Sequence, residues 1–452
     1  MREARDISTL PTAALAFGLA HGGIMVAKEH TLTARQAAVL GRLLCSLAYQ
    51  KALEEERASP GSIRSLVHER GAADVFLRFA AELPGETNVD DVLATAEPRF
   101  ADSLRTTDPS RVRDAVRRLT DLATGFIPAM AFKTAVIQLD LFNLLADGPL
   151  SADAVSKARG VKAASLTVAL DALVAFGLLE KNSAGQYANS ELGSYLTSTA
   201  PVQLAPITAW VHQFYDLHRF MFEAIRDHEP QYKAAFGKTS EDLWEEQIYR
   251  NPMEMRRFQA FMEACAIPIG QEIAERVDFS AISHVLDVAG GTGALSLEIL
   301  RRHPHLHGTI MDLPNVVDLA EERIEQLGLG ARASAISGDL FTGSYPSGAD
   351  AITLSWILHD WNDDSARQIL SHCYTALANG GRLLISEIVL DDDAPSTPFQ
   401  AVMQLQMLAA CAPGARERTE SEYRRLVTGV GFSDFEVIRL EGLRDLISAR
   451  RR

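Results

Sequence analysis

Short apolar runs alternate with stretches of helical periodicity through the last third of the chain. The first run, 284–288, is mainly apolar and contains Asp287 near its end, which is typical of a strand buried in a parallel sheet. Glycines follow at 290, 291 and 293, and apolar residues then recur at helical spacing. This pattern predicts a strand, a glycine turn and a helix, the first half of a nucleotide-binding α/β unit.

The same alternation continues towards the end of the sequence. It predicts further strands at 308–312, 333–336, 351–357 and 382–387, and a closing antiparallel pair at 435–440 and 443–449. Polar side chains stand at the ends of strands, where ligands bind in open α/β sheets: Asp287, Asp312, Asp339, His359 and Glu387. Asp312 lies about twenty residues after the glycine turn, as expected for a carboxylate that bonds a ribose hydroxyl, although it also fits a helix N-cap.

Residues 1–125 carry helical periodicity but no motif that indicates chemistry. Proline and glycine pairs at 60–61 and 84–85 end two predicted helices, and Asp108 with Pro109 marks the start of another. Arginines at 111, 113, 117 and 118 form either a solvated face or a face that binds a partner. We therefore expect an all-helical N-terminal extension whose role the sequence leaves open.

Residues 126–200 have the order helix, helix, helix, hairpin that is typical of a winged helix. The predicted helices are 132–145, one that Ser151 caps, and 165–177, and the hairpin strands are 178–180 and 186–188. The window holds five Lys/Arg against six Asp/Glu, and its last helix offers Ser165, Thr167 and Asp171, a poor match for phosphates. These residues therefore indicate a winged-helix domain that serves dimerisation and does not bind DNA.

Residues 201–280 are rich in aromatic side chains at helical spacing. Such a stripe more often builds a core than a pocket, and we expect some of both, because the segment leads into the α/β domain. The prediction is a helical connector that lines a ligand pocket. Its large side chains are Trp210, Phe214, Tyr215, Phe220, Phe222, Trp244, Phe258 and Phe261, followed by Met262.

Composition and charge disfavour several classes of partner. The 452 residues include 44 basic and 59 acidic side chains, and the net charge of −15 disfavours nucleic acid and anionic membranes. Cysteines at 45, 265, 373 and 411 lack metal or redox spacing and predict free thiols in a reducing cytoplasm. The first residues lack a signal-peptide pattern, and proline and glycines interrupt the apolar stretch 10–27, so no membrane span is expected.

The glycine turn does not fit the motif of dinucleotide-binding proteins. A G-x-G-x-x-G frame that starts at Gly291 meets Gly293 but then places Ser296 at the third position. The turn fits D-x-x-G-G-T-G instead, in DVAGGTG at 287–293. Five further motifs follow: MDLP at 311–314, GDLF at 338–341, WILHDWNDD at 356–364, GGRLLISEIVLDDD at 380–393 and GARERTESEYRRL at 414–426.

With these motifs in order, residues 126–452 resemble small-molecule O-methyltransferases of the plant caffeate/flavonoid type and their bacterial natural-product relatives. The resemblance implies a Rossmann-like class I methyltransferase domain at 281–452, after the winged-helix dimerisation domain and a connector that lines the acceptor pocket. It further implies a homodimer that uses S-adenosylmethionine, releases S-adenosylhomocysteine and methylates a hydroxyl of a small aromatic acceptor. Methyl transfer of this kind needs no metal, and the sequence contains no cluster with metal-binding spacing.

The resemblance also implies residue roles. His359 is the expected general base, and Glu387 and Glu417 are expected to bracket it and orient its ring. The expected cofactor-binding residues are Asp287, Gly290, Asp312, Asp339, Leu340, Ser355 and Trp361, and the expected acceptor-binding residues are Phe258, Met262, Met407 and Asp360. Gln404 and the segment 409–415, with Cys411 and Pro413, depart from the family pattern and leave the identity of the acceptor open.

A histidine is a chemically reasonable base for removing a phenol proton. A phenol has a pKa of about 10 and a histidine of about 6.5, so full proton transfer before attack costs on the order of 5 kcal/mol. A hydrogen-bonded His359 can instead remove the proton as the methyl moves, while a carboxylate on the far ring nitrogen stabilises the imidazolium. The remaining requirement is that oxygen, methyl and sulfur lie in line.

Two other functions remain open from the sequence. Some relatives with this fold bind S-adenosylmethionine but catalyse decarboxylation, hydroxylation or rearrangement, because function does not follow from fold. A winged helix coupled to a cofactor-sensing domain would instead be a regulator. His359 with Glu387 and Glu417 favours methyl transfer, and the acidic balance disfavours a DNA-binding regulator.

Overall fold

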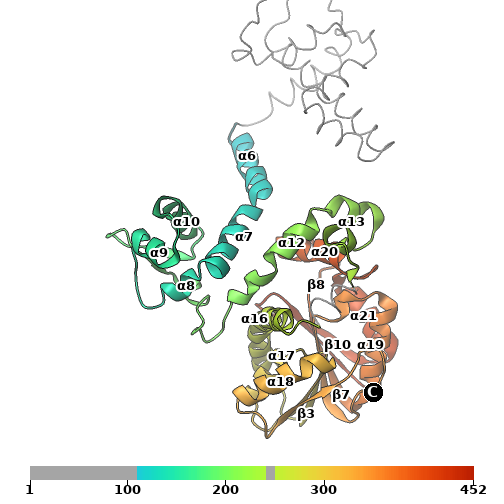
Figure 1. Ribbon diagram of the computed structural model, residues 1–452. Helices are drawn as coiled ribbons and strands as arrows, with labels where there is room; N and C mark the ends of the chain where they lie inside the picture. The colour runs from blue at the N-terminus through green and yellow to red at the C-terminus, as the bar shows by residue number, and fades with distance from the viewer. Residues whose placement is uncertain (1–108, 241–249) are drawn as a thin grey trace, which may run out of the picture. The chain divides into compact units, whose positions relative to one another are not determined.

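The computed structural model describes residues 109–240 and 250–452. The chain divides into two units, Met1–Leu122 and Ala123–Arg452. Helix α6 (Pro109–Thr124) begins at the proline that the sequence marks as a helix start (Figure 1). The helices predicted within 1–108, together with Cys45 and Trp244, lie outside the described residues. None of the helices in the described ranges is long and apolar enough to cross a lipid bilayer.

A seven-stranded mixed sheet forms the centre of the second unit (Figure 1). Its strand order is β10-β11-β7-β6-β3-β4-β5; the strands from β7 to β5 run parallel, and β11 pairs antiparallel with β7 and β10. The predicted α/β fold with a closing antiparallel pair is therefore confirmed. The strands are β3 (His284–Val288), β4 (His307–Asp312), β5 (Ala333–Ser337), β6 (Ala349–Ser355), β7 (Leu377–Glu387), β10 (Ser433–Ile438) and β11 (Asp445–Arg450).

Several strand ends differ from those predicted, and two of the differences have a clear cause in the backbone. β6 stops at Ser355 and does not reach 357, because Trp356 adopts a φ of +55°, outside the extended conformation of a strand. β7 starts at Leu377 and not at 382, because Leu377 already pairs with Ala349 across a register irregularity. Backbone conformation and pairing decided both ends, and neither is visible in the hydrophobic pattern.

Helices cover both faces of the sheet (Figure 1). Side chains alternate between the two cores along each strand, so Leu286 packs in one core and Val285 in the other. Burial on both faces explains why the strands read as nearly continuous apolar runs. One face carries α19 (Asp363–Ala376) and α21 (Glu420–Val430), and the other carries α16 (Pro252–Arg276), α17 (Ala294–Arg302) and α18 (Pro314–Gln326).

Residues 126–200 form a small helical region with its own core. The predicted single helix 132–145 is wrong, because a π-helical turn and then Asp140, with a φ of +41°, interrupt it. Ser151 caps the next helix as predicted, accepting a hydrogen bond from Ala154 N at 3.2 Å. The predicted hairpin is present and pairs Glu180 with Ala188. The elements are α7 (Phe126–Lys133), η2 (Thr134–Gln138), α8 (Leu141–Leu144), α9 (Ala152–Arg159), α10 (Ala163–Ala175), β1 (Leu179–Lys181), β2 (Tyr187–Asn189) and α11 (Glu191–Ser194).

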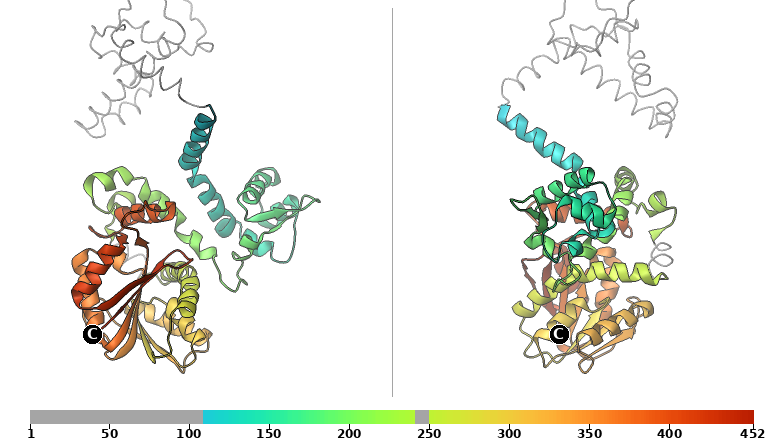
Figure 2. Two further views of the ribbon diagram at one scale, coloured as in Figure 1. Left: turned by 180° about the vertical axis from the view of Figure 1, so that it is seen from behind. Right: turned by 60° about the vertical axis from the view of Figure 1, so that its left-hand side comes forward.

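The described part of 201–280 is helical, as predicted, and its aromatic residues divide between core and surface. Phe214 and Phe258 pack around the buried Leu217 and Met255, whereas Phe222 is 67% exposed. Helix α20, from the carboxyl-terminal part of the chain, packs against α12 and α13 (Figure 2). Besides α16, the elements are η3 (Ala205–Trp210), α12 (Val211–His218), α13 (Met221–Asp227), α14 (Tyr232–Phe236) and, joining them, α20 (Pro398–Ala410).

Candidate active site

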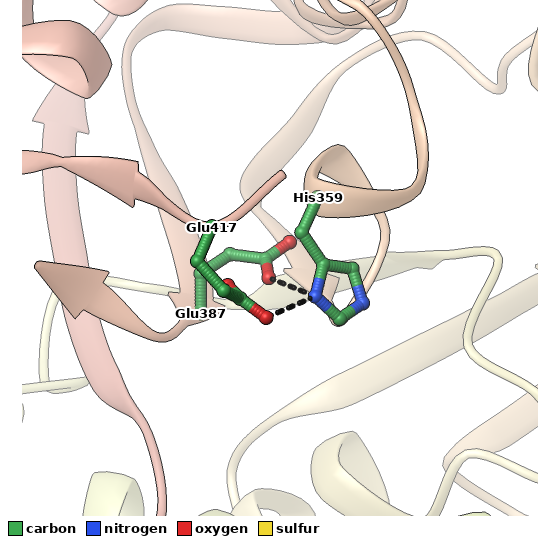
Figure 3. A group of neighbouring side chains, drawn as sticks. All are labelled: His359, Glu387 and Glu417. Atoms are coloured by element: carbon green, nitrogen blue, oxygen red, sulfur yellow. Dashed lines mark hydrogen bonds and ion pairs between the residues drawn. The ribbon is translucent and has the colours of Figure 1, made fainter. Parts of the chain in front are cut away.

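His359 lies on a short 3₁₀ turn, η5 (Leu358–Asp360), directly after β6, and is only 4% exposed. Its Nδ1 lies 2.8 Å from Glu417 Oε1 and 3.8 Å from Glu387 Oε2 (Figure 3). Glu387 ends β7, and Glu417 directly precedes the short strand β9 (Arg418–Thr419). The fold thus brings together three residues from separate segments, with both carboxylates on the Nδ1 side of the ring.

Glu387 holds the backbone that carries the histidine. Its Oε1 accepts hydrogen bonds from the backbone N–H groups of Ile357 and Leu358, at 2.9 and 2.8 Å. Its Oε2 is buried with no hydrogen-bond partner among the described residues and faces the imidazole. Glu387 therefore fixes the turn and places a carboxylate beside Nδ1, while Glu417 accepts the hydrogen bond of the Nδ1–H group.

Arg418 is a buried residue of this site that the sequence reasoning missed. Its side chain is completely buried, and it donates to Leu358 O at 2.7 Å, to Trp361 O at 2.6 Å and to Asp363 Oδ1 at 3.0 Å. The guanidinium therefore holds the backbone on both sides of His359 in place. The one feature of the sequence that points to Arg418 is its position directly after Glu417 in the GARERTESEYRRL motif.

Arg444 was also missed, and it lies behind the histidine ring in a three-layer stack. Its guanidinium lies 4.5 Å from the Trp356 ring centre, and that ring stacks on His359 at 5.9 Å and an interplanar angle of 14°. Arg444 Nη1 donates to Ser355 Oγ at 2.7 Å, so this hydroxyl, expected at the cofactor, is engaged within the protein. The turn between β10 and β11 carries Arg444, and sequence spacing gave no reason to connect it with the site.

The environment makes the imidazole more basic than a free histidine. Burial by itself lowers the pKa of His359, but the carboxylates of Glu387, Asp360 and Glu417 outweigh it and raise the pKa to about 10. The other ring nitrogen, Nε2, lies 3.5 Å from Asp360 Oδ1. This pKa is close to that of a phenol, which is also about 10, so proton transfer from the phenol to the neutral ring is nearly balanced, but the ring must first lose its own proton, which it holds at neutral pH.

The glycine turn after β3 brings backbone close to a position that a ligand can occupy. Gly291 has a φ of +59°, and a Cβ there would lie 2.7 Å from Gln259 Oε1. The N–H of Gly291 donates to Asp312 Oδ2 at 2.7 Å, which joins the turn to the end of β4. At Gly290 a Cβ would lie 2.5 Å from Asp287 Oδ2. A close-fitting turn with a carboxylate at the end of the next strand is the arrangement expected for binding S-adenosylmethionine, with Asp312 placed for the ribose.

The two carboxylates at this turn differ in their surroundings. Asp287 is 2% exposed, and its oxygens accept from Ser296 Oγ and Thr353 Oγ1, both at 2.6 Å. Burial raises its pKa to about 6, although both hydroxyls oppose the shift. Asp287 therefore ties the turn to β6 and α17 from behind. Asp312 accepts from Gly291 N and Leu313 N, both at 2.7 Å, and burial raises its pKa as well.

The remaining residues expected at the cofactor lie at the ends of β5 and β6. Asp339 is exposed and accepts from Phe341 N at 2.6 Å, and Leu340 is half-buried beside it. The Trp361 ring meets the Phe341 ring edge to face at 4.8 Å. Asp312 ends β4, Asp339 follows the neighbouring strand β5, and Trp361 follows β6, which is separated from β4 by β3; all three lie at the carboxyl ends of parallel strands.

The residues expected at the acceptor come from α16 and α20. Phe258 and Met262 are half-buried on α16, and Met407 is 5% exposed on α20. Cys411, at the end of α20, donates to Asp360 Oδ1 at 3.3 Å and lies 3.6 Å from Met407 Sδ. These contacts link α20 through Asp360 to the Nε2 side of His359.

His359, Glu387 and Glu417 also form the one group in the described ranges whose ligand atoms lie close enough to hold a metal, within 4.8 Å of one another. The Nδ1–Glu417 hydrogen bond argues for a proton between these atoms, where a metal would have to lie. The Glu387 oxygen that faces the backbone is already taken by two N–H donors. The arrangement therefore fits a general base with its orienting acids better than a metal centre.

The fold and the site together define a class I methyltransferase: a mixed, mainly parallel sheet with a glycine turn after the interior strand β3, and a buried histidine hydrogen-bonded to an acid. The model of an O-methyltransferase domain matches residues 218–433, and that of an O-methyltransferase dimerisation domain matches 120–199. The chain belongs to the S-adenosylmethionine-dependent O-methyltransferase family, as the sequence motifs indicated.

Relatives and solved structures agree with this assignment. The chain is 34% identical to a 3-hydroxy-5-methyl-1-naphthoate 3-O-methyltransferase of Streptomyces sahachiroi, over 71% of this chain and 90% of that protein. It is 30% identical to an N,N-dimethyltransferase of Streptomyces rimosus, OxyT, over 75% and 96%. Human N-acetylserotonin methyltransferase, solved with S-adenosylmethionine, superposes with a TM-score of 0.69 at 29% identity, covering 76% and 99%. All three are methyltransferases, and the cofactor of this family is S-adenosylmethionine.

Proposed function

We propose that this protein transfers the methyl group of S-adenosylmethionine to a hydroxyl of a small aromatic acceptor, with His359 as the general base. The observation that carries the proposal is the buried His359, which donates through Nδ1 to Glu417 and leaves Nε2 on the side of Asp360. Similarity to an enzyme named for a hydroxylated naphthoate supports an aromatic acceptor. The similarity to an N,N-dimethyltransferase makes the acceptor atom a point to be tested.

In the proposed mechanism, the acceptor hydroxyl donates to His359 Nε2. S-adenosylmethionine supplies a methyl group on a positively charged sulfur when it is bound. The proton moves to Nε2 as the oxygen–carbon bond forms and the carbon–sulfur bond breaks, and S-adenosylhomocysteine is released. Glu417 and Glu387 stabilise the resulting imidazolium, and Trp356 holds the ring plane.

The cofactor is proposed to lie across the carboxyl ends of β3, β4 and β5. Asp312 is assigned to the ribose hydroxyls, and Asp339 with Leu340 to the adenine. Gly290 is assigned to the part of the turn where the cofactor approaches the backbone closely. Asp287, Ser355 and Trp361 are assigned to the walls of this site. The position of Asp312, bonded to the N–H of Gly291 at 2.7 Å, supports the assignment.

The domain roles are part of the same proposal. Residues 281–452 carry the cofactor and the base, and 201–280 line the acceptor pocket through Phe258 and Met262, with Met407 and Asp360 completing it. Residues 126–200 form the dimer contact. The free thiols of Cys265, Cys373 and Cys411 support a reducing, cytoplasmic setting.

A homodimer is the proposed assembly. The dimerisation model covers 120–199, and this region leaves large apolar side chains exposed that a second copy would bury: Phe126, Ile127, Ile137, Val168 and Phe176. Light scattering of the purified protein should report the mass of two chains. A single-chain mass at micromolar concentration would contradict a stable dimer.

A methyl-transfer assay tests the reaction directly. The protein is incubated with methyl-labelled S-adenosylmethionine and a panel of phenols, hydroxynaphthoates and aromatic amines, and products are resolved by mass spectrometry. We expect a phenolic or hydroxynaphthoate product that is heavier by one methyl, with an equal amount of S-adenosylhomocysteine. If only the amines are methylated, the acceptor atom is nitrogen and not oxygen. An acceptor altered without S-adenosylhomocysteine would indicate decarboxylation, hydroxylation or rearrangement instead.

The pH dependence tests the base. Since the surrounding acids raise the pKa of His359 to about 10, the site is protonated at neutral pH, and kcat/KM should rise about tenfold per pH unit towards that value. Glu417→Gln removes the acid bonded to Nδ1 and lowers this pKa, so the rising limb should move to lower pH. The maximal rate should fall by about 10²–10⁴, because the imidazolium loses its partner.

The matched control is Glu436→Gln, on the exposed edge strand β10, which should leave the pH profile unchanged. A Glu417→Gln enzyme whose rising limb coincides with that of the wild type would remove Glu417 from the base.

A further inference from the structure

Gln259 is a buried amide on α16 that has little to bond within the protein. Its side chain is 6% exposed, and among the described residues its Nε2 donates only to the thioether of Met255, at 3.8 Å. A thioether is a weak acceptor. No hydrogen bond to Gln259 Oε1 is found within 109–240 and 250–452. A largely buried amide with one weak hydrogen bond in this part of the chain has donors and an acceptor available for a ligand.

The amide lies against the glycine turn. A Cβ placed on Gly291 would be 2.7 Å from Gln259 Oε1 and 3.9 Å from its Nε2. The packing of Ile269 and Ile273 of α16 with Leu295 and Leu297 of α17 holds the helix in this position. A ligand group that lies against the backbone of Gly291 therefore comes within hydrogen-bond distance of the Gln259 carboxamide.

The order of the strands indicates which part of the cofactor that group is. Asp339 follows β5, Asp312 ends β4 and His359 follows β6, and the sheet order is β6-β3-β4-β5. A cofactor with its adenine near Asp339 and its ribose near Asp312 must bring its sulfur towards His359. Its amino-acid end then lies over the turn after β3, beside Gly291 and Gln259.

We infer that Gln259 binds the amino-acid end of S-adenosylmethionine, its Oε1 accepting from the α-ammonium and its Nε2 available to the α-carboxylate. This inference rests on the proposed placement of the cofactor over the glycine turn. A neutral amide suits the zwitterionic end because it offers one acceptor and two donors without adding charge. Gln259 is then a cofactor-binding residue outside the glycine and acid motifs.

Two ligands separate this role from a structural one. S-adenosylhomocysteine carries the amino-acid end, and 5′-methylthioadenosine has the same nucleoside and thioether without it. Gln259→Met replaces the amide by an apolar side chain of similar length. By calorimetry, this variant should bind S-adenosylhomocysteine about tenfold to a hundredfold more weakly and bind 5′-methylthioadenosine within about twofold of the wild type.

The outcomes are distinct. Equal losses for both ligands would mean that Gln259 only supports the turn, and unchanged binding of S-adenosylhomocysteine would also overturn the inference. Gln259→Asn keeps the amide but draws it back by one methylene, so the same selective loss is expected without an apolar substitution. Asp312→Asn should weaken the binding of both ligands, since both contain the ribose. If it weakens the binding of neither, while Gln259→Met weakens only that of S-adenosylhomocysteine, then the proposed ribose contact is wrong and the role of Gln259 is supported.

Discussion

Replacing His359 with asparagine should lower the rate of methyl transfer by about 10²–10⁴-fold while S-adenosylhomocysteine affinity stays within about twofold. The asparagine amide still offers Glu417 a donor near the former Nδ1, so the buried acid keeps a partner and the fold is preserved. What is lost is Nε2, the atom on the side of Asp360 that is assigned to take the acceptor proton. Steady-state kinetics and calorimetry on one preparation measure both quantities.

His305→Asn is the matched control. His305 lies between α17 and β4, at the amino-terminal end of the parallel strands, and its ring Nε2 lies 3.1 Å from Phe279 O. It should change the rate little. If His359→Asn turned over like the wild type, proton removal would have to be assigned to another group or to the solvent.

Replacing Arg418 with methionine should be the most destabilising change in the catalytic domain. It removes the donor to Trp361 O, leaves Leu358 O with only the long backbone hydrogen bond from Trp361 N at 3.4 Å, and removes the ion pair to Asp363, whose side chain is 41% exposed. Unsatisfied buried carbonyls cost roughly 1–3 kcal/mol each, so we expect a loss of about 2–5 kcal/mol in the free energy of unfolding. This corresponds to a fall in melting temperature of about 5–20 °C for a domain of this size.

Thermal melting followed by circular dichroism measures this change. Arg367→Met is the matched control, since Arg367 pairs with Asp364 on the surface of α19 and is 48% exposed. That variant should stay within about 0.5 kcal/mol of the wild type. Arg418→Lys should recover only part of the lost free energy of unfolding, because a single ammonium group cannot bond to both carbonyls in the way that the two guanidinium nitrogens do. An Arg418→Met protein that melts like the wild type would show that the loop does not depend on this residue.

The hydrophobic pattern predicted the strands of the sheet well and the ends of some elements poorly. Each strand that the pattern indicated is present, because burial on both faces leaves a plain apolar run. The end of β6 at Trp356 and the break of the first helix at Asp140 were not predicted. Both residues adopt a positive φ, which tertiary contacts impose and which neither residue type announces.

The site residues divide in the same way. His359 and Glu387 are predictable because they stand at predicted strand ends, and Glu417 because its motif resembles that of the family; the structure brings the three within reach of one another. Arg418, Arg444 and Gln259 were not named. Their positions depend on packing between segments far apart in the chain, and as single polar residues they look like ordinary surface side chains in the sequence.

The sequence by itself determined the α/β fold, the family and the residue types of the site, because alternation, glycine turns and motif spacing are local properties of the chain. Only the tertiary structure decided what those residues do to one another. It set which nitrogen of His359 meets the acids, raised the pKa of that ring to about 10 and left the Gln259 amide facing the turn. Hydrogen bonds, burial and pKa depend on groups that the fold brings together from distant segments.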